Sequence, residues 1–110
     1  MIARIWRGQA TSANADAYFK HVTTTVFPAL ARIAGHHGAY LLRREVTGGV
    51  EFLAVTLWDS RAAIEAFAGS DIETAIVEPE ARTVLSSFDT FARHYEVAHG
   101  GDCTSPGRGA

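Results

Sequence analysis

The sequence is poor in lysine and has no excess of positive charge. Lys20 is the only lysine, and 10 Lys and Arg residues stand against 12 Asp and Glu residues, which gives a formal net charge of -2. A nucleic-acid partner requires clustered excess Lys and Arg to bind its phosphates. The composition therefore predicts no nucleic-acid partner.

Cysteine and long apolar runs are also scarce. Cys103 is the only cysteine, so the chain can form neither an intrachain disulfide nor a thiolate metal site. The start, MIARIWRG, has no apolar run long enough for a signal peptide, and no segment approaches the roughly 20 apolar residues of a membrane span. We therefore expect a cytoplasmic protein with no membrane partner.

The residues that are present are typical of a folded domain. Hydrophobic residues make up 47% of the chain and charged residues 20%, and the length of 110 residues suits one domain of the usual size, about 100–150 residues. Residues 98–110 show no periodicity and contain no large apolar residue. We predict one domain over residues 1–97 and a disordered tail over residues 98–110.

Periodicity in the first half of the chain predicts a strand and then a helix. Residues 1–7 alternate as a strand that Gly8 ends. Over residues 15–34, apolar side chains recur at helical spacing. Pro28 lacks a backbone donor, so a kink or break is expected just before it, and Gly35 marks the end of the helix.

The second half predicts a hairpin, a helical region and a last strand. Residues 38–46 and 50–58 form two strands joined by a turn at Thr47-Gly48-Gly49, since glycine accepts the positive φ angles of such turns. The last strand is expected over residues 88–97.

The helical region between these strands is predicted in two pieces. Asp59-Ser60 caps the first helix, and Gly69 interrupts it. Ser70 and Glu73 have the spacing of a capping box, which predicts a second helical segment that contains Pro79.

This order predicts an α+β fold of the ferredoxin-like βαββαβ type, with a four-stranded antiparallel sheet and helices on one face. The third strand is apolar on both sides. Its uncovered face is either Phe52, Ala54, Thr56 and Trp58 or Leu53, Val55 and Leu57, depending on register. An apolar sheet face left in water predicts a homodimer. The alternative is a monomer whose own tail covers this face, but the tail has no large apolar residue with which to cover it.

Four segments carry a resemblance to a known family: MIARIWRG, GAYLLRRE, VEFLAVTLWDS and FDTFARHYEV. Over residues 1–97 the sequence resembles the antibiotic biosynthesis monooxygenase (ABM) family. The resemblance implies a dimeric α+β barrel with a pocket between the sheet and the helices of each protomer. Its members include cofactor-free oxygenases that form quinones, haem-degrading enzymes and proteins with no known reaction, so activity must be argued from the site.

Three residues are candidates for catalysis. The resemblance implies that Trp58, at the end of the third strand, lines the pocket; a core tryptophan is the alternative. His37, next to His36 in the connection before the second strand, is a candidate general base. Two adjacent histidines cannot both reach one metal ion, so no metal site is predicted.

Arg43 is the third candidate, as the cation that holds a phenolate or carboxylate of the substrate. Arg43 and Arg44 lie on opposite faces of their strand, so one of them points inward. An ion pair with Glu51 or Asp89 is the alternative explanation, because buried charges are usually paired.

The candidates for substrate binding are aromatic or imidazole side chains. They are Trp6, Tyr18, Tyr40, His94 and Tyr95. His94 and Tyr95 point to opposite faces of the last strand, and which of His36, His37 and His94 faces the pocket stays open. His21 is predicted to be a surface residue.

A haem cofactor is not expected. The haem-degrading relatives carry an axial His in the second helix and an Asn in the first strand; here Val77 stands near the first position, and ARIWRG has no Asn. Ligation of a haem by His21 or another His from elsewhere in the chain is the alternative. The resemblance therefore implies a small enzyme that oxidises an aromatic or polyketide-like substrate with O₂ and needs no cofactor. The alternatives are a ligand-binding or stress-associated dimer without turnover, and a cofactor-free isomerase, cyclase or decarboxylase.

Overall fold

The computed structural model describes residues 1–101, and the lone cysteine lies outside that range. Its elements are β1 (Ile2–Ala10), α1 (Ala15–His21), the π-helical turn η1 (Val22–Val26), α2 (Phe27–Leu30), β2 (His36–Val46), β3 (Gly49–Trp58), α3 (Arg61–Ala68), α4 (Pro79–Val84), β4 (Ser87–Phe88) and β5 (Arg93–Glu96). Within this range, no helix is long and apolar enough to cross a membrane.

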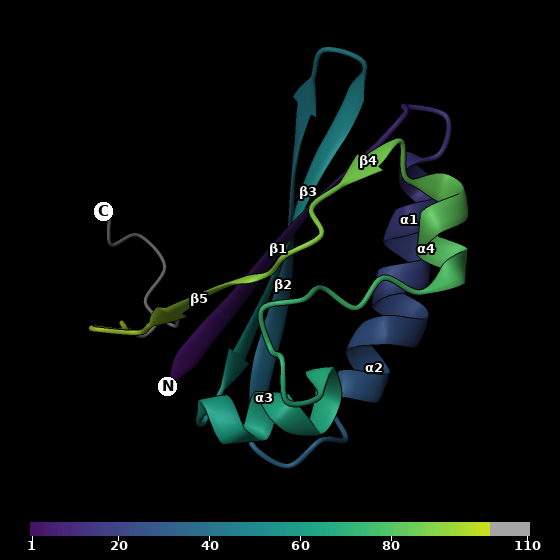
Figure 1. Cartoon of the computed structure of the whole chain (residues 1–110). Helices are drawn as coiled ribbons and strands as arrows, with labels where there is room; N and C mark the ends of the chain where they lie inside the picture. The colour runs from purple at the N-terminus through teal and green to yellow at the C-terminus, as the bar shows by residue number, and fades with distance from the viewer. Residues whose placement is uncertain (102–110) are drawn as a thin grey trace.

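One antiparallel sheet organises the chain. Its strand order is β2-β3-β1-β4, and β5 also pairs with β1. Figure 1 shows the helical run α1–α2 and helix α4 on one side of the sheet, with α3 at its end. The predicted α+β class and ferredoxin-like arrangement are confirmed. The hairpin turn is also confirmed, with Gly48 at a φ of 89°.

The first strand is longer than predicted, because Gly8 lies within β1 and does not end it. A Cβ atom at this position would meet the Trp6 ring at 3.0 Å and a Leu85 methyl group at 3.3 Å. The absence of a side chain at Gly8 therefore lets the Trp6 ring and Leu85 pack closely against the strand.

The first helical region ends at Leu30, earlier than predicted, and widens into the π-turn η1 before α2. The hydroxyls of Thr23 and Thr24 donate to the carbonyl oxygens four residues earlier, at 2.9 and 2.6 Å. Such hydroxyls compete with the backbone donors and bend a helix. The break expected before Pro28 is thus a wide turn, and the proline lies in the first turn of α2.

The predicted capping box at Ser70 is wrong, and no helix starts there. Helix α3 begins as expected, with the Ala63 amide donating to the Ser60 hydroxyl at 3.2 Å. Residues 69–78, here called the strap, are irregular up to α4. The Asp71 carboxylate accepts from the Glu73 amide at 3.2 Å and from the Thr74 hydroxyl at 2.7 Å, a local turn that replaces the helical start.

The predicted last strand is split into β4 and β5 by the strap. The Ala75 amide donates to the Thr90 carbonyl at 2.9 Å, and the Ala92 amide donates to the Glu73 carbonyl at 2.8 Å. The middle of the last strand therefore pairs with the strap, while its two ends pair with β1.

The sheet has one covered and one uncovered face. Phe52 and Trp58 are fully buried against the helices. The opposite face, here called the bare face, carries the alternate residues: Ile5, Tyr40, Leu42, Leu53, Val55 and Leu57. Of the two sets proposed for the uncovered face, the structure selects Leu53, Val55 and Leu57.

Candidate functional site

A mostly apolar cavity lies between the sheet and the helices. Its walls come from β1, β3, all four α-helices, η1 and the strap. The less polar lining residues are Trp6, Tyr18, Val22, Val26, Phe27, Leu30, Ala54, Phe67, Ala75, Ile76, Val77 and Ala81. Arg4, His21, Thr56 and Glu78 supply the polar groups. An apolar cavity with a few polar groups is the usual form of a small-molecule site.

Arg4 places a buried cation in this cavity, with 5% of its surface exposed. Its Nη1 donates to the Ile72 carbonyl oxygen and, at 2.9 Å, to His94 Nε2, while Nη2 lies 3.5 Å from the Thr74 carbonyl oxygen. The guanidinium also lies over the Phe67 ring, 5.6 Å from its centroid. No carboxylate of residues 1–101 forms an ion pair with it.

This unpaired charge has a chemical consequence. Burial lowers the pKa of Arg4, yet a guanidinium stays charged at neutral pH. Of its five N–H donors, Nε–H and one N–H of Nη2 make no hydrogen bond within residues 1–101. These two donors form the side of the guanidinium that binds carboxylates and related oxyanions in a bidentate manner. Arg4 is therefore suited to hold an anion.

His94 lies behind Arg4 and is held in its neutral form. Since a guanidinium can only donate, Nε2 of His94 accepts, and the ring proton is on Nδ1. Burial lowers the pKa of His94 most; the positive charges of Arg4 and Arg61 lower it further, against an opposing effect of Glu73. His94 thus positions Arg4 and does not line the cavity.

Trp6 and Tyr18 are the two predicted binding residues that line the cavity. Trp6 Nε1 donates to the Asp89 carbonyl oxygen at 2.7 Å, which fixes the ring in the wall. The Tyr18 ring lies 4.8 Å from that of Phe52. Burial raises the pKa of Tyr18, so its phenol keeps its proton at neutral pH.

The three predicted catalytic residues all lie outside the cavity lining. Trp58 is fully buried one layer behind the wall, where Nε1 donates to the Thr56 hydroxyl at 2.8 Å. His37 lies in β2, not in a connection, and its exposed ring pairs with Asp59. Arg43 is exposed over the Phe52 ring, at 5.4 Å from its centroid.

Tyr40 and Tyr95 also lie away from the cavity. Both are more than half exposed and belong to the bare face of the sheet. The same face carries an ion cluster in which Glu51 accepts from Arg44 Nε and from Arg7 Nε, each at 2.7 Å. The ion pair expected between Glu51 and an arginine of the second strand is therefore made by Arg44.

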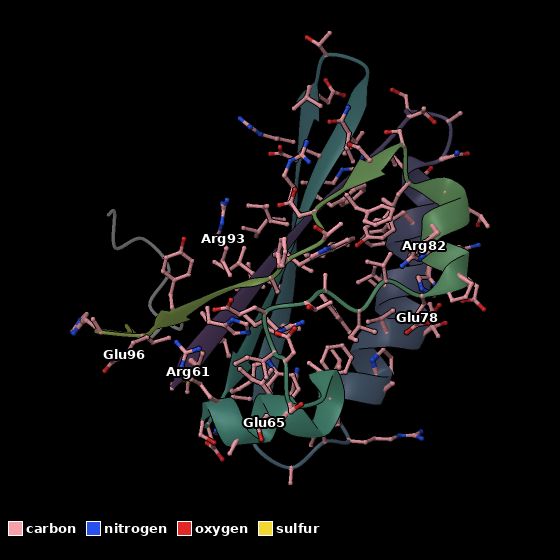
Figure 2. All side chains as sticks on the ribbon, in the orientation of Figure 1. Arg61, Glu65, Glu78, Arg82, Arg93 and Glu96 are labelled. Carbon is pink, nitrogen blue, oxygen red and sulfur yellow. The ribbon has the colours of Figure 1, made fainter. Side chains whose placement is uncertain are left out.

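His21 and Glu78 were not foreseen as site residues. His21 Nε2 is enclosed and makes no hydrogen bond within the described chain, and it lies 3.6 Å from Glu78 Oε2. Figure 2 shows Glu78 beside the helical run α1–α2, on the same side of the sheet. The signal was present in the sequence, because His21 follows Tyr18 by one helical turn and so shares its inward face.

Solved structures with the same fold include two oxygenases. SnoaB, a cofactor-independent oxygenase from Streptomyces nogalater, is 16% identical, with 90% of this chain and 94% of that chain covered and a TM-score of 0.63. A monooxygenase from the gene ActVA-Orf6 of Streptomyces coelicolor, in complex with nanaomycin D, is 15% identical, with 94% and 92% covered and a TM-score of 0.59.

The haem-degrading protein MhuD from Mycobacterium tuberculosis, with two haems in its active site, has the same fold. It is 21% identical, with 93% of this chain and 100% of that chain covered and a TM-score of 0.59. Val77 lines this cavity near the place where the resemblance puts the axial His of the haem-degrading relatives, so the cavity has no histidine at that position. His21 is the one histidine lining it within residues 1–101, its Nε2 faces Glu78, and Val77 adds an aliphatic wall.

The amino-acid sequence itself also matches a protein family. No individually curated protein matches the chain. The sequence model described as antibiotic biosynthesis monooxygenase matches residues 1–79, most of the domain that carries the cavity. The chain belongs to the antibiotic biosynthesis monooxygenase family.

Proposed function

We propose that the protein is a cofactor-independent oxygenase that binds a small aromatic or polyketide-like substrate in the cavity above Arg4. One observation supports this proposal most: a buried guanidinium, without a carboxylate partner in residues 1–101, faces a cavity walled by aromatic and aliphatic side chains. An uncompensated buried charge is costly, so a site that keeps one is suited to a ligand of opposite charge.

The reaction would use the substrate anion as the reductant. Loss of a proton from an activated C–H group leaves the electron pair on the substrate, and Arg4 stabilises the resulting oxyanion. This electron pair forms a C–O bond to O₂, and the abstracted proton returns to the peroxide to give a hydroperoxide. Loss of water, which takes the second hydrogen of that carbon, then leaves a carbonyl. The protein would orient the anion and exclude water from it, as the apolar walls allow.

A second copy of the chain is the proposed partner of the bare face. Leu42 and Tyr40 are at least half exposed there, beside Leu53, Val55 and Leu57. A contiguous apolar sheet face is typical of an interface, and a two-fold axis would bury two such faces against each other. The cavity lies on the other side of the sheet, so each protomer would keep its own site.

Oxygen consumption tests the proposed activity. Purified protein free of added metal and flavin is given a panel of hydroxyanthrones, and O₂ uptake and the quinone product are measured together. Ala54→Phe should fill the cavity and abolish uptake, whereas Ala62→Phe, on the exposed surface of α3, should not change it. Binding without turnover would favour a ligand-binding protein, and turnover without O₂ would favour an isomerase, cyclase or decarboxylase.

A further inference from the structure

We infer that His21 is the general base of this site and that Glu78 positions it; the inference rests on the proposed function and adds the proton acceptor that function requires. The two residues come from different elements, His21 from the end of α1 and Glu78 from the end of the strap, at the N-cap of α4. Both line the same cavity as Arg4. The site then combines one anion-binding cation with one base.

The environment of the two ring nitrogens supports this role. Nε2 is the enclosed nitrogen, without a hydrogen bond in the described chain, and the Glu78 carboxylate is the charged group it faces. Nδ1 is not among the enclosed atoms of residues 1–101 that lack a partner. A carboxylate opposite one ring nitrogen favours the proton on that nitrogen and leaves the lone pair on the other.

The separation of 3.6 Å between Nε2 and Oε2 is longer than a hydrogen bond. Catalytic hydrogen bonds are often long in ligand-free proteins and shorten when the substrate binds. The Glu78 side chain is 41% exposed, so it has room to change its rotamer and shorten this distance. The pair is therefore arranged to form its hydrogen bond as the cavity fills.

The other titratable groups near the cavity are unsuited to the role. Tyr18 keeps its phenolic proton because burial raises its pKa, so it cannot accept a second one. His94 uses Nε2 to accept from Arg4 and does not line the cavity. The His36 ring packs edge-on against Trp58, at a centroid distance of 4.9 Å, behind the wall.

The step that His21 performs is a single proton transfer. The C–H bond of the anthrone-like substrate breaks, its electron pair delocalises onto the carbonyl oxygen next to Arg4, and an N–H bond forms at Nδ1 of the imidazole. The imidazolium ion is then stabilised by hydrogen bonding from Nε2–H to the Glu78 carboxylate. Neither oxidant nor reductant is consumed until O₂ reacts with the anion.

The test measures this step without oxygen. A hydroxyanthrone that is neutral in the assay buffer is mixed anaerobically with the protein, and the visible absorption band of its anion is recorded. The wild-type protein should show the band, and His21→Gln should lose it. In air, His21→Gln should lower kcat by about 100-fold or more, with a much smaller change in KM.

Controls separate a base from a structural residue. Dinitrophenol, which is already an anion in neutral water, should bind His21→Gln and wild type equally, since it needs no base. His21→Asn is a second variant in case His21→Gln folds poorly, as checked by circular dichroism. Glu78→Gln should reduce kcat less than His21→Gln does and should add nothing in the double variant, because it acts through the histidine.

Three outcomes would overturn the inference: a full anion band in His21→Gln, an additive effect of Glu78→Gln in the double variant, or wild-type binding without any anion band. Failure of the proposed function looks different. In that case the anion band forms in wild type and depends on His21, but admission of O₂ leads to no uptake.

Discussion

Arg4 and Arg7 belong to the same strand, three positions apart, and lie on opposite faces of the sheet. Arg7 shares the Glu51 carboxylate with Arg44 on the bare face, and its Nη1 lies 3.8 Å from Asp89 Oδ1, so its charge is balanced within the chain. Within the described residues 1–101, Arg4 on the helix side donates only to carbonyl oxygens and to a neutral imidazole. The difference indicates that the bare face balances its strand arginine but leaves apolar side chains uncovered, whereas the covered face encloses a cavity beside an arginine without an ion pair in residues 1–101.

The largest effect is expected from a charge placed on the bare face. Leu53→Lys would bury an unpaired ammonium in the proposed dimer interface, at a cost of about 3–5 kcal/mol, which weakens association roughly a thousandfold. Sedimentation equilibrium would show a monomer. Ala66→Lys, on the exposed surface of α3, is the matched control and should leave the mass unchanged. A Leu53→Lys protein with the same mass as wild type would contradict a role for the bare face in assembly.

The second-largest effect is expected when the charge of Arg4 is removed. Arg4→Met keeps most of the side-chain volume but removes the anion-binding donors, and affinity for dinitrophenol should fall about 10- to 150-fold. Quenching of tryptophan fluorescence measures this affinity, since Trp6 lines the cavity. Arg7→Met removes an equal charge from the other face and should leave affinity nearly unchanged. Equal losses in the two variants would mean that the effect is one of net charge.

A smaller effect is expected at the histidine behind Arg4. In a proton NMR titration the pKa of His94 should lie below its ordinary value of about 6.5. Arg4→Met removes one cause of this lowering but not burial, which is the larger one, so the pKa should rise without reaching the ordinary value. Because the unfolded chain binds this proton more readily, His94 favours folding above pH about 6.5 and destabilises the fold as the pH drops below it. An unchanged pKa in Arg4→Met would contradict the contact.

The smallest effect lies in the balanced cluster of the bare face. Hydrogen bonds from Arg44 and then Arg7 hold the pKa of Glu51 below its ordinary range. The stability that Glu51 contributes is therefore present above the carboxyl's ordinary pKa and is lost as the pH falls through the lower folded value. Glu51→Gln should make the acid decline of the melting temperature shallower, and Glu65→Gln, on the exposed side of α3, should not. Identical acid profiles would show that the cluster adds no stability.

The elements predicted best from the sequence are those fixed by local alternation. The hairpin of β2 and β3 follows from the period of two on each side of Gly48, and its register then decided which face stays bare. The strap was missed because its conformation depends on pairing with residues 90–92, a long-range contact that its helical composition conceals. A capping-box spacing cannot reveal that a nearby Asp71 will take the same donors.

The site was harder to predict than the fold for a related reason. The alternation of residues 1–7 indicates that Arg4 and Arg7 lie on opposite faces of the sheet. It does not indicate which face the helices cover, and the covered face decides which arginine is buried. His21 had a detectable helical position next to Tyr18, yet its polarity suggested the surface. Trp58, identified by family resemblance, does not line the cavity, whereas the Phe67 ring that stacks on it at 6.2 Å does.

The strap, which lines the cavity and pairs with the last strand, is also the proposed entrance for a ligand. Two backbone hydrogen bonds, from Ala75 to Thr90 and from Ala92 to Glu73, join the strap to the sheet edge. Arg4 also donates to the Ile72 and Thr74 carbonyl oxygens of the strap. Because the strap makes fewer backbone hydrogen bonds than a central strand, it opens locally at a lower free energy than the whole domain. Amide hydrogen exchange at Ala75 and Ala92 should therefore be much faster than at the centre of β3, and it should slow when the cavity is filled. The strap would then open and close locally while the strands of the sheet stay paired.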